Sequence, residues 1–274
     1  MILNTKYLVQ KSEGETLALL LERVRRENGL SADIPLTYAG RLDPMAEGLV
    51  IILAGEECKK KDQYLGLDKV YEYEVLFGVE TDTFDILGLP TSNPALPAGR
   101  SQLLTSNKSL NNDFESKVKT IIEKFIGRQT QVYPPYSSKT INGVPLFQLA
   151  REGKITELEL PKIDIEIYSH EFLGIREISC DELLAQVEQR IKKVVGDFRQ
   201  QEILDAWHSS QLLTSNSQLV IAFFRISCSS GTYIRRIASD MGHLFGTGAI
   251  AWKIKRTKIG DYSTSPRLGE GRVR

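Results

Sequence analysis

The residues best suited to chemistry in this sequence lie at positions 38–49, in the stretch Y-A-G-R-L-D-P-M-A-E-G-L. It places the carboxylate of Asp43 directly before Pro44, whose ring restricts the next φ to about −65°. Gly40 and Gly48 bracket this pair, and glycine permits a close approach of backbone or ligand. Residues 49–54 then form an apolar run typical of a buried strand. A carboxylate on a rigid loop before a core strand predicts a catalytic site, although an Asp-Pro pair also fits an ordinary turn or a helix N-cap.

This stretch resembles the catalytic motif G-x-L-D-P-x-A-x-G-L of the TruB family of tRNA pseudouridine synthases. Further signatures of that family follow in the family's order. They are K-V-Y at 69–71 with F-G-V-E-T-D-T-F-D at 77–85, P-P-Y-S-S-K at 134–139 with A-R-E-G at 150–153, S-G-T-Y-I-R at 230–235, and K-I-K-R-T-K-I-G at 253–260. The resemblance covers about residues 34 to 263.

The resemblance implies an isomerase that converts uridine to pseudouridine in the T loop of tRNA, at position 55. The N1–C1′ bond is cleaved, C5 is joined to C1′, and neither a cofactor nor a metal takes part. The target uridine must leave its stack, so base flipping is implied. The implied catalytic residues are Asp43, as nucleophile or electrostatic stabiliser, Arg235, which orients that carboxylate, and Tyr71, which stacks on the uracil and receives the C5 proton.

The same motifs imply a set of substrate-binding residues: Tyr38, Gly40, Leu42, Lys69, Lys139, Tyr233, Ile254 and Arg256. Ile254 would supply an apolar wall. Arg256 and the lysines beside it fit phosphate contacts, although such lysines also serve on strand edges to keep a surface soluble. Tyr38 stands where the family has His, and the family's N-terminal K-P-x-G-x-[ST]-S is only echoed at residues 11–16. The resemblance therefore extends to the chemistry at Asp43 but not to the detailed RNA contacts of this edge.

Composition restricts the remaining possibilities. Formal net charge is zero, so RNA affinity must come from local basic patches rather than from a global field. Three scattered cysteines lack the spacing of a disulfide framework or a zinc site, and the three histidines are isolated. With no signal peptide and no apolar run of membrane length, we expect a cytoplasmic monomer that binds the T arm of tRNA and contacts no membrane.

Hydrophobic periodicity predicts an α+β domain: a large mixed, mostly antiparallel sheet flanked by helices and loops, which agrees with the pseudouridine synthase fold that the resemblance implies. We expect helices after Thr16, at 114–125, from Pro145 to Arg151, at 183–195 and after Gly231, with strands at 49–54, 71–77, 163–167, 219–227 and 249–260. Residues 1–263 form a single catalytic domain in this prediction. Low-complexity composition predicts disordered insertions at 91–112 and 205–217 and a disordered tail at 264–274, in place of the family's usual C-terminal RNA-binding domain.

Two other functions fit the same residues. The chain could be a catalytically idle module that binds or folds RNA and keeps the site as a uridine pocket, but such a module has no need of Asp43, Tyr71 and Arg235 together. It could also be a pseudouridine synthase that acts on another RNA, because RNA specificity depends on shape and loop contacts.

Overall fold

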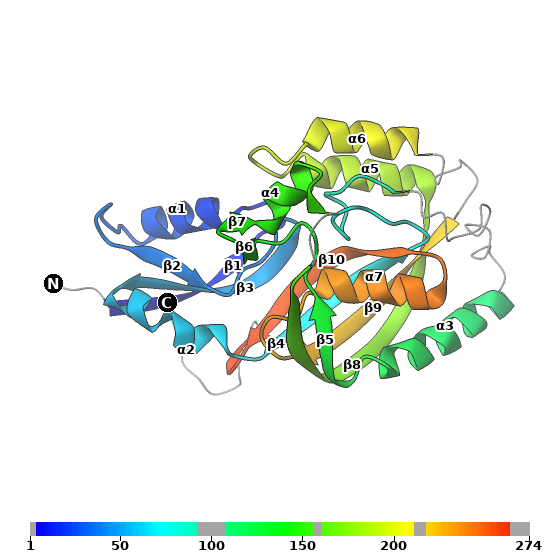
Figure 1. Cartoon of the computed structure of the whole chain (residues 1–274), viewed down its shortest axis with the longest axis horizontal. Helices are drawn as coiled ribbons and strands as arrows, with labels where there is room; N and C mark the ends of the chain where they lie inside the picture. The colour runs from blue at the N-terminus through cyan, green and yellow to red at the C-terminus, as the bar shows by residue number, and fades with distance from the viewer. Residues whose placement is uncertain (1–3, 92–107, 156–159, 211–217, 264–274) are drawn as a thin grey trace.

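A computed structural model describes residues 4–91, 108–155, 160–210 and 218–263. Most of its strands belong to one sheet, which Figure 1 shows running through the length of the molecule. Their order across the sheet is β1 (Asn4–Lys11), β3 (Ala46–Gly55), β10 (Ala249–Ile259), β4 (Lys69–Phe77), β9 (Gln218–Cys228), β8 (Lys162–Ser179) and β5 (Gly127–Val132). β2 (Leu36–Ala39) pairs with β3, and β11 (Tyr262–Ser263) pairs with β10.

The sheet is mixed but mostly antiparallel, as predicted. Among the described strands only β3 and β10 run parallel, over Ala46–Gly48 and Ile254–Arg256, while the other pairs of this sheet are antiparallel. A separate short hairpin is formed by β6 (Thr140–Ile141) and β7 (Val144–Pro145). The parallel contact therefore brings the stretch that follows Asp43 next to the C-terminal basic strand.

Helices cover both faces of the sheet (Figure 1). The largest core lies beneath α1 (Leu17–Glu27), α3 (Lys108–Glu123) and α7 (Ile234–Phe245), which pack on residues such as Val50, Val75 and Phe224. On the other face, α5 (Cys180–Ile191) and α6 (Gln200–Ser209) pack on Leu76, Ile221 and Trp252. The short helices are η1 (Glu56–Lys60), α2 (Lys61–Leu65) and α4 (Leu146–Arg151).

Local sequence signals account for most of these elements. The Thr16 hydroxyl accepts a hydrogen bond from the Leu19 N–H and so caps α1, as the sequence predicts. In β4, alternate residues from Tyr71 to Phe77 enter the same core, which confirms the predicted period of two. The helix predicted at 183–195 ends earlier, at Ile191, and Val195 is exposed.

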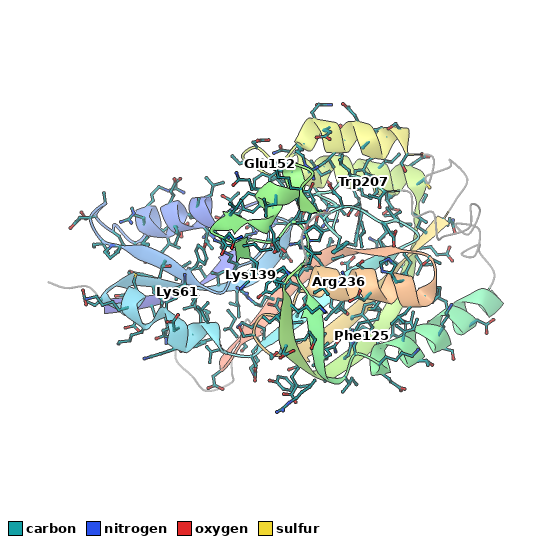
Figure 2. The ribbon with its side chains drawn as sticks, in the orientation of Figure 1. Lys61, Phe125, Lys139, Glu152, Trp207 and Arg236 are labelled. Carbon is teal, nitrogen blue, oxygen red and sulfur yellow. The ribbon has the colours of Figure 1, made fainter. Side chains whose placement is uncertain are left out.

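The predicted boundaries of both insertions were wrong. Residues 205–209 belong to α6, where Leu204 and Trp207 are buried. Figure 2 labels Trp207 at this helix. The Trp207 indole N–H also donates to the Gly88 carbonyl at 3.2 Å. The helical spacing of Ile203, Leu204 and Trp207 was the signal for this helix. α3 likewise begins at Lys108, inside the predicted insertion at 91–112. The rest of that insertion from residue 92, residues 211–217 and the tail lie outside the described residues.

Within the described part of the chain, every helix is too short or too polar to cross a membrane.

His170 gives the core a pH dependence. It lies in β8, 6% exposed, where its Nε2 shares a hydrogen bond with the Tyr73 hydroxyl and its ring packs among Tyr73, Phe125 and Phe224. Burial lowers the pKa of His170 to about 4. The unfolded chain, with an ordinary imidazole, therefore binds more protons between pH 6.5 and 4, so stability is lost as pH falls through this range.

We predict that His170→Phe removes part of this acid sensitivity. Lowering the pH from 7 to 5 should cost the wild type about 2 kcal/mol more of unfolding free energy than the variant, because the variant has no imidazole to protonate. Urea unfolding at the two pH values measures the difference, and subtracting the variant removes the contribution of carboxylates common to both. Equal losses in the two proteins would show that His170 does not set the acid response.

Candidate active site

A cavity of about 700 Å³ opens where the N-terminal end of β3 meets β10 and the start of α7. Its lining comes from segments far apart in the chain: the Asp43 loop, the start of β4, the segment 136–151, the residues before α6, the start of α7, and β10. A volume of this size is within the range of small-molecule pockets. The fold thus gathers most of the predicted motifs around one hollow.

Asp43 and Arg235 meet in this cavity. The Arg235 Nε lies 2.7 Å from the Asp43 Oδ2, although the two residues are 192 positions apart. The guanidinium is buried, with 3% of the side chain exposed, whereas the carboxylate is 38% exposed and lines the cavity. Arg235 therefore holds one oxygen of the carboxylate from behind while the group stays open to a ligand.

Asp85 is a second carboxylate beside Arg235, and sequence reasoning did not select it. Its Oδ2 lies 3.6 Å from Arg235 Nε, and its Oδ1 accepts hydrogen bonds from the Leu87 N–H and the Thr83 hydroxyl. Burial raises the pKa of Asp85, against the pull of the nearby guanidinium. Burial alone would lower the pKa of Arg235, but Asp43 and Asp85 outweigh it, so the net shift is upward. The T-D-T-F-D motif, which ends at Asp85, was the sequence signal that could have identified this carboxylate.

The start of α7 is held so that Arg235 points at Asp43. Gly231 has φ +87°, and a Cβ there would lie 2.4 Å from the Ile163 side chain, so the turn requires glycine. The buried Gln131 side chain then accepts from the Tyr233 N–H and donates to the Tyr233 carbonyl. Arg235 completes its contacts by donating to the carbonyls of Thr83 and Tyr136.

Arg256 holds the Asp43 loop from the other side. Its guanidinium donates to the carbonyls of Leu49, Arg41 and Gly40 at 2.7, 3.0 and 3.2 Å. Arg256 contributes to the cavity lining, but only 1% of it is exposed, so its contact with an RNA phosphate stays a prediction. A buried arginine whose guanidinium binds three backbone carbonyls positions the loop.

Gly48 makes this contact possible. It pairs with Arg256 across the parallel β3–β10 contact, and a Cβ at Gly48 would lie 2.2 Å from the Arg256 carbonyl oxygen. The close approach of the two backbones therefore requires glycine at position 48, in agreement with the expectation from the sequence.

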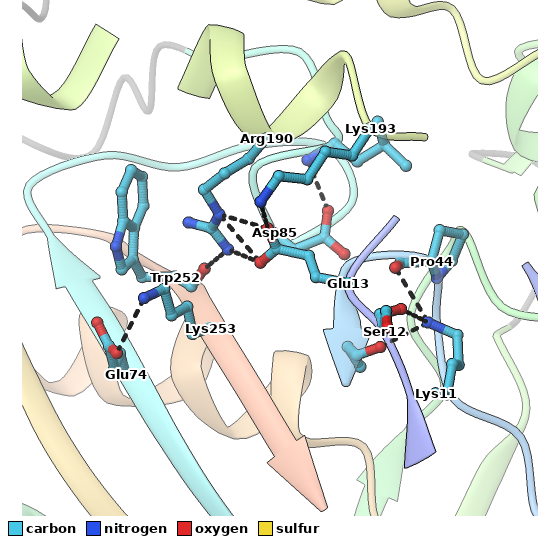
Figure 3. Close-up of polar contacts among 12 residues, drawn as sticks. Lys11, Ser12, Glu13, Pro44, Glu74, Asp85, Arg190, Lys193, Trp252 and Lys253 are labelled. Atoms are coloured by element: carbon cyan, nitrogen blue, oxygen red, sulfur yellow. Dashed lines mark hydrogen bonds and ion pairs between the residues drawn. The ribbon is translucent and has the colours of Figure 1, made fainter. Parts of the chain in front are cut away.

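A second buried cation, Lys11, contacts the loop beyond Asp43. Its ammonium donates to the carbonyls of Pro44 and Ala46 at 3.2 and 2.6 Å, and Figure 3 shows it beside Pro44. Burial lowers the pKa of Lys11 to about 8, although the charge of Asp43 opposes the shift. The Gly14 N–H also donates to the Pro44 carbonyl at 2.8 Å. The N-terminal segment therefore supports the Asp43 loop even though its sequence departs from the family pattern.

The same segment is held in turn by α5. Glu13 forms an ion pair with the buried Arg190 at 2.7 Å, and the Arg190 guanidinium lies 4.7 Å from the ring centre of Trp252 (Figure 3). Lys193 adds a longer contact to Glu13 at 3.5 Å. Through Glu13, α5 fixes the segment that contacts Pro44.

Apolar and aromatic side chains form part of the cavity wall. Leu42, Tyr71 and Ile254 line it and belong to the main core, so they are fixed in place. Burial raises the pKa of Tyr71, an effect that the neighbouring Arg256 partly offsets. The Tyr71 hydroxyl is consequently protonated at neutral pH.

The remaining predicted site residues differ in whether they line the cavity. Tyr38, Gly40, Lys69 and Tyr233 line the cavity, but Lys139 does not; its ammonium lies 5.5 Å from the ring centre of Tyr133. Lys69 donates to the Ser230 hydroxyl and the Leu65 carbonyl, and burial together with Arg256 lowers its pKa to about 8. Burial and the charge of Asp43 raise the pKa of Tyr233 to about 12.

No cluster of three or more His, Cys, Asp or Glu side chains suited to a metal ion occurs among the described residues.

Known proteins resemble this chain in sequence over most of its length. The family model described as TruB family pseudouridylate synthase (N terminal domain) matches residues 35–193. The tRNA pseudouridine synthase B of Aquifex aeolicus is 30% identical over 256 residues, which is 93% of this chain and 68% of that protein. The chain belongs to the TruB family. The tRNA pseudouridine synthase B of a Nostoc species is 31% identical over 84% of this TruB-family chain, which spans 60% of that relative's length.

Solved structures confirm the pseudouridine synthase fold. A chain from the "Crystal Structure of a Cbf5-Nop10-Gar1 Complex" superposes with a TM-score of 0.54 at 14% identity. The match covers 95% of this TruB-family chain and half of the solved chain. At this identity the likeness concerns the fold alone.

We predict that Arg256→Lys destabilises the protein by about 3 kcal/mol, because one ammonium cannot reach three carbonyls and leaves buried acceptors unpaired. Urea unfolding measures the change. Lys255→Met, on the exposed side of the same strand, is the matched control and should change stability by no more than about 0.5 kcal/mol. A similar, small loss in both variants would contradict the positioning role of Arg256.

Proposed function

We propose that this protein isomerises uridine to pseudouridine in the T loop of tRNA, at position 55. The observation that carries the proposal is the Asp43–Arg235 ion pair, which presents a partly exposed carboxylate in a cavity that Tyr71 and Ile254 also line. Family membership and the names of its relatives support the reaction and the RNA class.

The cavity suits a flipped uridine. An apolar and aromatic wall fits a base removed from its stack, since base–aromatic contacts need no particular base edge. Tyr71 would stack on the uracil. When C5 is joined to C1′ it would lose its proton, and N1, freed by cleavage of the N1–C1′ bond, would gain one, so the reaction has no net change in protons. In this proposal the Asp43 carboxylate acts on C1′, either as a nucleophile or by stabilising positive charge as the N1–C1′ bond breaks.

Arg235 supplies the orientation. Because its guanidinium also contacts Asp85 and the carbonyls of Thr83 and Tyr136, it cannot turn away when a ligand binds. A fixed donor costs no reorganisation during the reaction, which is the condition for effective electrostatic catalysis.

We propose that one chain is sufficient, and that the protein acts on the T arm as a monomer with residues 1–263 as its catalytic domain. Asp43, Tyr71 and Arg235 all come from the same chain, and a single sheet connects the elements that carry them. The exposed cations at the cavity, including Arg41 and Arg151, are the candidates for phosphate contacts.

We predict that Asp43→Asn lowers turnover on T-arm RNA by about 10⁴-fold or more, because the amide can neither attack C1′ nor carry the compensating charge. Release of tritium from C5 of labelled uridine measures turnover, and sequencing after chemical derivatisation locates the product. The substitution is isosteric, so thermal unfolding should show a folded protein. If folded Asp43→Asn kept a tenth of wild-type turnover, the assignment of Asp43 would be wrong. If the wild type formed pseudouridine at a position other than 55, the proposed target would be wrong.

A second prediction separates orientation from charge. Arg235→Lys keeps the positive charge but loses the planar donor set that reaches Asp43, Thr83 and Tyr136. We expect kcat to fall about 10²-fold through misplacement of the carboxylate, with the Kd for RNA within about threefold of the wild type. Single-turnover kinetics and fluorescence anisotropy measure the two quantities. Equal losses in binding and turnover would instead make Arg235 an RNA contact.

A further inference from the structure

The α5–α6 segment (residues 180–209) is an excursion between two strands that are already paired. β8 and β9 lie side by side as far as Ser179 and Gln218, so the chain leaves the sheet and returns to the same end of it. The excursion packs on the sheet face that carries Leu76 and Trp252. Its connecting residues before α6 reach the cavity, where Phe198 and Arg199 form part of the lining.

Two arginines that line the cavity form ion pairs in which the excursion takes part. The two pairs differ in burial. Arg199 lies 2.9 Å from Asp82, with 18% and 23% of the two side chains exposed, and its guanidinium is 4.7 Å from the ring centre of Tyr136. Arg151, at the end of α4, lies 3.4 Å from the Asp197 carboxylate, and 85% of the Asp197 side chain is exposed. The Arg199–Asp82 pair is half-buried and is reinforced by the Tyr136 ring. The Arg151–Asp197 pair is longer, and its carboxylate is open to water.

This difference decides which arginine can change partner. An exposed ion pair contributes only about 0–1 kcal/mol, so exchanging its carboxylate for another anion costs little. The planar guanidinium fork matches phosphate as well as carboxylate. Arg151 keeps one contact in any case, since its Nη2 donates to the Asp197 backbone carbonyl at 2.8 Å. Arg151 is therefore held at the cavity with a carboxylate that a phosphate can displace.

We propose that Asp197 occupies the position of an RNA phosphate on Arg151 in the free protein, so that Arg151 is a backbone-phosphate site of the cavity and Asp197 lowers its affinity. The inference rests on the proposed function, because the anion that displaces Asp197 from Arg151 is a phosphate of the RNA whose uridine enters the cavity. An RNA phosphate must then compete with Asp197, and removing the carboxylate charge strengthens RNA binding.

The test measures binding without turnover. Fluorescence anisotropy with a labelled T-arm stem-loop gives Kd over a series of salt concentrations for wild type, Asp197→Asn and Arg151→Gln. Asp197→Asn should bind about threefold to fivefold more tightly, because it removes the charge and one of the two carboxylate oxygens that face Arg151. Asparagine keeps one acceptor oxygen for the Arg199 N–H. Arg151→Gln should bind more weakly, with the salt slope reduced by about one phosphate contact.

Two controls make the result specific. Asp205→Asn removes the same charge from an exposed position on α6 and should leave Kd unchanged. In the Arg151→Gln background, Asp197→Asn should give no further gain, because the two act on one site. Thermal unfolding verifies that each variant is folded.

Equal affinity of Asp197→Asn and Asp205→Asn, or weaker binding by Asp197→Asn, would overturn the inference while leaving the proposed function intact. The proposed function is judged on the wild type alone: if it forms no pseudouridine in the stem-loop or in tRNA and binds neither, the function fails and the inference fails with it.

Discussion

Satisfying the donors of the buried Arg235 guanidinium is the constraint on which the rest of this structure depends. A guanidinium with 3% of its side chain exposed is stable in a core only when its donors are satisfied. Here Asp43, Asp85 and the carbonyls of Thr83 and Tyr136 meet that requirement. Because these partners come from three separate loops, satisfying Arg235 also fixes the relative positions of segments that form the cavity.

Buried cations that bind backbone carbonyls hold the Asp43 loop itself. Arg256 contacts the loop before Asp43 and Lys11 contacts it after, so the carboxylate lies between two anchored turns. Both contacts need close packing of strands, and the parallel β3–β10 pair with Gly48 provides it for Arg256. The loop is therefore rigid without a covalent link, which is the condition for holding a reactive group in a productive geometry.

The α5–α6 excursion connects this centre to other parts of the cavity lining. Met45, two residues after Asp43, packs in the same cluster as Leu183, Val187 and Trp207. The excursion also reaches Glu13 through Arg190, and Tyr136 and Asp82 through Arg199. The excursion thus supports the Asp43 loop from the far face of the sheet, and its connecting residues contribute to the cavity lining.

The sequence by itself determined the family and the fold class, and it pointed to Asp43 and Arg235 as candidate site residues, because each of these rests on local patterns. The period of two from Tyr71 to Phe77, the Thr16 cap and the motifs around Asp43 and Arg235 are all readable from neighbouring residues. Only the tertiary structure showed which groups Arg256, Lys11 and Asp197 contact. A buried and an exposed cation look alike in sequence, and the difference arises from which backbone carbonyls or carboxylates distant segments bring within hydrogen-bonding distance.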